Sequence, residues 1–100
     1  MVLDPLRAQL LSSVERGGSI RVAAQNVRIS YMHAWVLLRD MGVCFGEALV
    51  ESQSGGGRGG KSWLTSAGRE VLKLYQAVEQ DARAGSARPL SRLRQLLLSK

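Results

Sequence analysis

The residues with the most distinctive chemistry lie along one side of the stretch from Tyr31 to Met41. If this stretch is helical, with about 100° between successive residues, it divides into an aliphatic side and a mixed side. The mixed side carries Tyr31, Met32, Trp35, Val36 and Arg39. A helix that buries one stripe normally shows charged and small polar groups opposite it. A face with two aromatic rings and a guanidinium instead suits contact with the bases and sugars of a nucleic acid.

These residues also have a structural interpretation. Trp35 can pack against a neighbouring element, and Tyr31 can be a half-buried core residue. Neither role excludes contact with a nucleic acid. The other side of the helix is predicted to be core, because its residues are small or aliphatic: Ala34, Leu37, Leu38 and Met41.

A glycine-rich segment, residues 53–60, is the second candidate binding element. It contains Arg58 and is followed directly by Lys61. Glycines let a backbone approach a phosphate or a narrow groove closely. The alternative is a flexible connector without a binding role. Short strands expected on either side, Ala48–Ser52 and Lys61–Thr65, favour a hairpin, which after a helix-turn-helix is the wing of a winged helix.

The helices that would position these residues are marked by caps and breaks. Asp4 and Pro5 predict a first helix that runs to about Arg16 and stops at Gly17-Gly18. Ser19 caps a second helix, whose apolar residues recur at helical spacing: Ile20, Ala23, Ala24 and Val27.

A tight turn at Arg28-Ile29 leads to Ser30, which caps the third helix. We expect this helix to reach Met41 and to be interrupted by Gly42, with further core supplied by Val43, Phe45 and Leu49. Helix, short turn and helix at this length form the helix-turn-helix pattern, whose second helix enters the DNA major groove.

The C-terminal part begins with a fourth helix, Ser66–Ala84, capped by Thr65. This helix is long for the domain it covers, which favours a two-fold dimer. A last short helix opens at Pro89 and must dock, contact phosphates or fray. We therefore expect a mainly α winged helix-turn-helix domain at residues 4–84, with a two-stranded wing and a long C-terminal helix. A basic, leucine-rich tail follows at residues 85–100.

Composition and charge narrow the classes of function. A chain of 100 residues with 45% apolar content fits one small domain, and it has no apolar run of membrane-spanning length and no secretory signal. We expect a cytoplasmic protein. Acidic and basic groups balance over residues 1–57, whereas residues 58–100 carry the whole net charge of +6. A basic region of this kind favours a polyanionic partner.

The sequence gives little support for an enzyme active site or a metal site. His33 is the only histidine and Cys44 the only cysteine, so neither a disulfide framework nor a metal site of several such ligands can form. We expect Cys44 to be a reduced core cysteine and His33 to be partly exposed. The glycine loop lacks the Gly-Lys-Ser/Thr ending of a nucleotide-binding loop. We predict no enzyme, no cofactor and no metal.

Four segments together resemble the N-terminal winged-helix domain of the molybdate-responsive transcriptional regulators, the ModE family: GGSIRVAAQNVRISYMHAW, FGEALVES, GGGRGGK and LTSAGREVLKLY. The layout is more distantly similar to the N-terminal domain of LysR-type regulators. The resemblance covers residues 6–78. Its most specific parts are Ser30-Tyr31, Ala34-Trp35 and the glycine-rich wing that leads into Leu64-Thr65.

The resemblance implies that Ser30 and Tyr31 start the recognition helix and that Trp35 is its characteristic tryptophan. It implies wing cations at Arg58 and Lys61 and a dimer built by the first and fourth helices. Three departures stand out. Met32 and His33 occupy positions where relatives often have Lys or Arg, and Arg28 stands where the turn often has glycine. The β-barrel domains that bind molybdate in this family would follow the fourth helix, but the printed sequence ends at Lys100.

We therefore expect a DNA-binding transcriptional regulator of the ModE type that lacks the molybdate-sensing domain, has no molybdate site and forms a homodimer. The alternatives are a protein-interaction module, which Met32 and His33 favour, and an architectural module that binds DNA without sequence preference. The expected contacts with double-stranded DNA are Ser19, Ser30, Tyr31, Met32, His33, Trp35, Val36, Arg39, Arg58 and Lys61.

Overall fold

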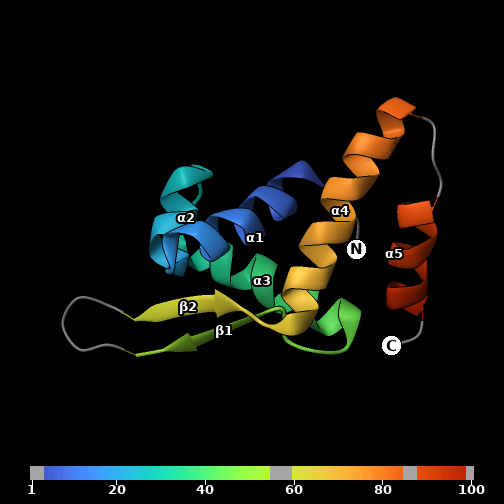
Figure 1. Cartoon of the computed structure of the whole chain (residues 1–100). Coiled ribbons are helices and arrows are strands. Elements are labelled where there is room, and N and C mark those ends of the chain that lie inside the picture. The colour runs from blue at the N-terminus through green and yellow to red at the C-terminus, as the bar shows by residue number, and fades with distance from the viewer. Residues whose placement is uncertain (1–3, 55–59, 85–87, 99–100) are drawn as a thin grey trace.

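The computed structural model describes residues 4–54, 60–84 and 88–98. Within these ranges the elements follow in the order α1 (Pro5–Gly17), α2 (Ile20–Asn26), α3 (Tyr31–Phe45), β1 (Val50–Gln53), β2 (Lys61–Leu64), α4 (Ser66–Ala84) and α5 (Arg88–Leu98). Figure 1 shows the two strands projecting to one side of the helices, with α4 and α5 together at the other side. This order confirms the mainly α winged helix-turn-helix with a two-stranded wing.

α1 begins and ends where its sequence signals place it. The Asp4 carboxylate accepts the Arg7 backbone N–H at 2.9 Å, and Pro5 occupies the first turn, where no intrahelical donor is required. Gly18 ends the helix in the left-handed conformation, at φ 71°. This reversal brings Ser19 into position to cap α2.

The helix-turn-helix is formed by α2 and α3. The Ser19 hydroxyl accepts the Val22 N–H at 2.9 Å, and the Ser30 hydroxyl accepts the His33 N–H at 3.0 Å. Between the helices Arg28 adopts φ 62°, a left-handed conformation that glycine adopts without steric penalty. Arg28 thus holds a left-handed conformation at the position where the resemblance leads us to expect glycine.

The Arg28→Gly variant should unfold with a free energy about 0.5–1 kcal/mol larger than that of the wild type. Removing the β-carbon relieves about 1–2 kcal/mol of left-handed strain, and the greater freedom of glycine in the unfolded chain offsets part of this gain. Urea denaturation measures the difference. Arg28→Ala is the matched control, because it removes the same charge and keeps the β-carbon. If the two variants were equally stable, the backbone at position 28 would not be strained.

α3 is longer than the sequence predicted, and the expected interruption at Gly42 is wrong. The helix continues to Phe45 and ends at Gly46, which adopts φ 78°. A glycine inside a helix costs about 1 kcal/mol, whereas burying a large apolar side chain such as Phe45 contributes about 1.5–3 kcal/mol. Phe45 is 3% exposed. Burial therefore outweighs the local preference of glycine.

The longer helix also corrects the prediction that Val43 belongs to the core. Val43 follows the buried Met41 by two positions, which is about 200° around a helix, and its side chain is 74% exposed. Phe45 and Leu49 are buried as predicted. Cys44 is half-buried and carries a free thiol.

One hydrophobic core joins the helices to the base of the wing. From α1 and α2 it receives Leu10, Leu11, Val14, Ile20, Ala23 and Ala24. From α3 it receives Ala34, Leu37, Leu38, Met41 and Phe45, so the predicted inner stripe of this helix is confirmed. The remaining buried members are Leu49, Leu64, Val71 and Leu72. The core thus fixes the orientation of α3 through its buried side, and the opposite side of the helix faces solvent.

The wing is an antiparallel pair in which Val50 lies opposite Leu64 and Gln53 opposite Lys61. Its inner face is tied to the helices, because the Ser62 N–H donates to the Gly18 carbonyl at 2.8 Å. Gly60 lies so close to the Gln53 carbonyl that a β-carbon there would collide with it. The wing is therefore held against the turn between α1 and α2.

The C-terminal helices complete the fold. The Thr65 hydroxyl accepts the Gly68 N–H at 3.0 Å and donates to the Ala48 carbonyl at 2.7 Å, which caps α4 as predicted. α5 docks on the same chain: Leu93 is 7% exposed, and Leu96 and Leu97 pack against the core.

Candidate nucleic-acid interface

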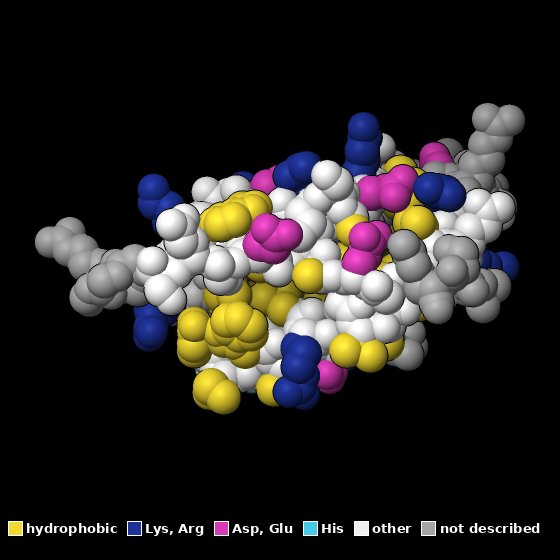
Figure 2. Space-filling model, turned by 90° about the horizontal axis from the view of Figure 1, so that it is seen from below, with side chains coloured by type: hydrophobic (Ala, Val, Ile, Leu, Met, Phe, Trp, Pro, Cys, Tyr) yellow, Lys and Arg dark blue, Asp and Glu magenta, His cyan; other side chains and the backbone are white. Residues whose placement is uncertain are grey.

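The outer face of α3 is exposed, as the helical wheel predicted. Tyr31, Trp35 and Val36 are each about two-fifths exposed, and Met32 is 68% exposed. The Arg39 side chain is also 68% exposed. We call these five residues the recognition face. Figure 2 shows hydrophobic side chains gathered on the underside of the molecule around a hollow, with basic groups at the margin.

A line of contacts links the recognition face to α2. The Arg21 guanidinium lies 4.8 Å from the centre of the Tyr31 ring. Tyr31 in turn meets Trp35 edge to face, with ring centres 6.5 Å apart. Cation–π and edge-to-face contacts of this kind each contribute about 0.5–1.5 kcal/mol. They hold both rings in a defined orientation, so Trp35 is a positioned surface residue rather than a core residue.

Sequence analysis missed Arg21 as a site residue. No local pattern distinguishes it from the other arginines, because its relation to Tyr31 arises only when α2 and α3 pack together. In the structure Arg21 is exposed on α2, away from the buried Ile20, Ala23 and Ala24. Arg21 supplies a cation beside the aromatic pair.

A groove of about 220 Å³, lined by both polar and apolar side chains, separates the helix-turn-helix from the wing. One wall carries Ser19, Arg21 and Tyr31, and the other carries Gln53 and Lys61. Cations on both walls and hydroxyl and amide groups between them suit the phosphate backbone of a nucleic acid. The structure therefore brings Ser19 and Lys61, which are distant in the sequence, to the same groove.

Ser19 and Ser30 already act as helix caps. In both, the hydroxyl oxygen accepts a backbone N–H. A hydroxyl that accepts in this way still has a proton to donate, which a phosphate oxygen can receive. The first turn of α3 has no acidic residue, so the positive end of the helix dipole there favours an anion. His33, in the same turn, is exposed.

The wing contributes an exposed cation at Lys61, whereas Arg58 lies outside the described residues. The outer surface of β2 also carries Trp63, which is 42% exposed and pairs across the strands with Glu51. Sequence analysis did not identify Trp63 as a surface residue. The alternation along β2, in which Ser62 and Leu64 are buried, places Trp63 outward.

Two of the described arginines after residue 57 lie in contacts within the fold and not on the recognition face. Arg69 donates to the Leu64 carbonyl at 2.9 Å, and Arg92 of α5 pairs with Glu70 of α4 at 3.3 Å. These cations serve contacts between elements of the fold. Among the described residues, Arg21 and Lys61 line the groove beside the recognition face, and Arg39 belongs to the face itself.

Across residues 4–54, 60–84 and 88–98, no group of three or more His, Cys, Asp or Glu side chains could hold a metal ion. In those same ranges no helix is both long and apolar enough to cross a membrane.

No family model matches the chain, but several known proteins are similar to it. The chain is 36% identical over 80 residues to the transcriptional regulator ModE of Haemophilus influenzae and 36% identical over 94 residues to the molybdenum transport protein ModE of Azotobacter vinelandii. It is 40% identical over 72 residues to the transcriptional regulator ModE of Yersinia pestis.

These alignments cover 80%, 94% and 72% of this chain, but only 31%, 35% and 27% of the three relatives. The chain thus spans about a third of the length of the curated relatives it matches, in their N-terminal region. The resemblance that was drawn from the helix-turn-helix and the glycine-rich wing is confirmed. Over the length that it shares with these relatives, the chain belongs to the ModE family.

Proposed function

We propose that this protein is a DNA-binding transcriptional regulator of the ModE type, located in the cytoplasm, and that residues 4–84 are its DNA-binding unit. The observation that carries the proposal is the recognition face, an exposed surface of two oriented aromatic rings and a guanidinium beside a cation-lined groove. The core residues behind α3 hold this surface in place. Relatives that are named transcriptional regulators support the assignment.

The recognition face would read the major groove. Arg39 can donate two parallel hydrogen bonds to a guanine, and Met32 and Val36 offer apolar contact to thymine methyl groups. Tyr31 and Trp35 would pack on sugars and bases. Ser30 and the N-terminal end of α3 would hold a phosphate.

The groove between α2 and the wing would follow the backbone of the duplex. Ser19, Arg21 and Lys61 would contact phosphates there. The sequence predicts Arg58 as a further phosphate contact, and this residue lies outside the described ranges. Phosphate contacts fix the register of a protein on DNA, while base contacts specify the sequence.

A two-fold dimer through α1 and α4 is the assembly we propose. α4 keeps Leu74, Tyr75 and Val78 half-buried, so part of its apolar side is still open to solvent. Burial raises the pKa of the Tyr75 phenol, and the nearby carboxylates of Glu79 and Asp4 raise it further. A second copy would cover this apolar area on α4.

A protein-interaction module is the competing function. The exposed apolar side chains of Met32 and Val36 favour it, because protein interfaces are enriched in methionine and aromatic anchors. Binding to duplex DNA decides between the two functions.

Duplex affinity measured against salt concentration tests the proposal. Each phosphate contact should add about −0.9 to the slope of log K against log salt. We expect a clear negative slope, because two cations, Arg21 and Lys61, line the groove. Affinity that does not change between low and physiological salt would refute a DNA-binding function.

The Lys61→Ala variant should make this slope shallower by about one unit per protomer, with a similar loss of affinity for all duplex sequences, because a phosphate contact carries no sequence information. Lys73→Ala is the matched control. It removes the same charge from α4, where Lys73 lines a polar hollow with Glu15 and Glu70. If the two variants change the slope equally, the wing is not at the interface.

A further inference from the structure

A second concave site lies beside the recognition face, between the C-terminal half of α3 and β1. Its volume is about 480 Å³, within the range of pockets that take small organic molecules, about 300–1,000 Å³. The floor consists of Ile20, Leu38 and Leu49, each less than 10% exposed. This floor belongs to the core, so the pocket keeps its shape without a ligand.

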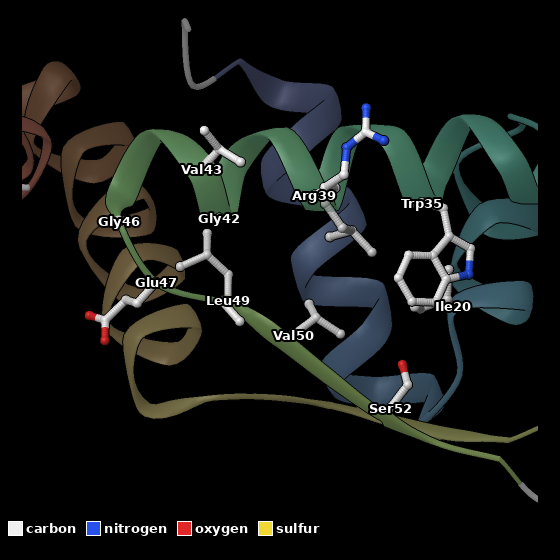
Figure 3. A pocket seen from close by; sticks show the side chains of 12 residues that line it. Ile20, Trp35, Arg39, Gly42, Val43, Gly46, Glu47, Leu49, Val50 and Ser52 are labelled. Carbon is white, nitrogen blue, oxygen red and sulfur yellow. The ribbon is translucent and has the colours of Figure 1, made fainter.

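The mouth of the pocket follows one line of α3. Trp35, Arg39 and Val43 are four residues apart, which places them one above another on the helix. Figure 3 shows Trp35 reaching from α3 toward Ile20 at one end, while Leu49 and Val50 face the helix from the opposite side. A small apolar ring can therefore lie between the indole and the valines.

The charged groups around the pocket favour an anion at one position. Arg39 pairs with Asp40 at 3.5 Å, and both side chains are more than half exposed, so this contact is weak. In Figure 3 the guanidinium points away from β1. The proposed site requires this exposed side chain, which lines the mouth, to turn toward the pocket. Glu47, at the other end, points away from the pocket. Guanidinium groups match carboxylates in a two-bond geometry.

We propose that this pocket binds a small aromatic carboxylate, with the ring between Trp35, Val43 and Val50 and the carboxylate on Arg39. Trp35 and Arg39 also belong to the recognition face. A ligand that holds them would therefore compete with DNA, and it would act as an effector of the regulator. This coupling rests on the proposed function, whereas binding to the pocket does not.

NMR with 2-naphthoate as the probe tests the site in the absence of DNA. The Trp35 indole N–H signal should shift and saturate, with a Kd below about 1 mM. The Trp63 indole signal should stay in place, because Trp63 lies on the outer surface of the wing; Trp63→Phe assigns the two signals. If the Trp35 signal does not saturate by about 10 mM probe, the site does not exist.

Charge dependence tests the assigned ligand class. The neutral alcohol naphthalen-2-ylmethanol should bind about tenfold more weakly than 2-naphthoate, and Arg39→Gln should remove this difference. Equal affinity of the two probes for the wild type would overturn the role of Arg39. A Trp35 signal that moves with protein concentration alone would show a second copy in the pocket and would also overturn the proposal.

A matched pair of valines tests the position of the ring. Val43→Gln should weaken both probes about fivefold, because it removes an apolar wall. Val22 is also an exposed valine on a helix, at 40% against 74% for Val43, but it does not line this pocket, so Val22→Gln should leave both affinities unchanged. Equal effects of the two substitutions would contradict the assigned pocket.

Competition with DNA is measured separately. At about ten times its own Kd, 2-naphthoate should raise the apparent Kd for duplex DNA about tenfold. Probe binding without any change in duplex affinity would refute the effector role. A protein that binds the probe but no duplex would refute the proposed function and leave the pocket intact.

Discussion

The Gly68→Ala variant should lose about 2–4 kcal/mol of its free energy of unfolding, although alanine is the better helix former by about 1 kcal/mol. Gly68 lies in the first turn of α4, against the backbone of residue Leu49. A β-carbon there would overlap the Leu49 carbonyl oxygen and lie 3.0 Å from its carbon. Backbone cannot move aside as a flexible side chain can, so α4 or the start of β1 must shift.

The contacts at this junction explain why a shift is expensive. The Leu49 carbonyl accepts the Thr65 N–H at 3.0 Å, and the Thr65 hydroxyl donates to the Ala48 carbonyl at 2.7 Å. Leu49 itself is 1% exposed. Displacing its backbone therefore disturbs the α4 cap, the base of the wing and the core together.

Gly42→Ala is the matched control, since it places the same methyl group at another helical glycine. The nearest atoms to a β-carbon at Gly42 are the Glu47 carbonyl oxygen at 3.4 Å and the Ala48 Cα at 3.5 Å, which are ordinary contacts. This variant should be as stable as the wild type or up to about 1 kcal/mol more stable. Urea denaturation compares the two; a Gly68→Ala protein as stable as Gly42→Ala would contradict the close approach of α4 and Leu49.

The Arg39→Ala variant should bind its preferred duplex about 10- to 100-fold more weakly and lose its preference at one base pair. A two-bond contact between arginine and guanine is worth about 1–3 kcal/mol of discrimination, and Arg39 is the exposed guanidinium of the recognition face. Competition binding against duplexes with single base-pair changes measures both effects.

Arg39→Lys separates charge from geometry. Lysine keeps the positive charge but not the planar fork, so the salt slope should stay near that of the wild type while the base preference weakens. If Arg39→Lys retained the full preference, Arg39 would act as a phosphate cation and not as a base reader.

Local signals in the sequence were sufficient to predict most of the fold. Asp4, Ser19, Ser30 and Thr65 each cap the helix that was assigned to them. The inner stripe of α3 was also predictable, because a helix in a small domain must bury one side and the aliphatic residues repeat at helical spacing.

The predictions that were wrong or missing concern features that depend on packing between elements distant in the sequence. Gly42 has the residue type of a helix end, but the burial of Phe45 three residues later continues the helix, and Val43 then turns outward. The contact between Arg21 and Tyr31, and the pocket between α3 and β1, depend on elements meeting across the fold. Neither leaves a pattern within a short stretch of sequence.

Selection from a pool of random duplexes tests the central claim most directly. A regulator that reads bases with the recognition face should enrich one sequence motif, and this motif should consist of two half-sites if the protein binds as a dimer. In the Arg39→Ala variant the preference at one base pair of the motif should disappear. Retention of duplexes without enrichment would indicate an architectural protein. Failure to retain any duplex at low salt would contradict the account.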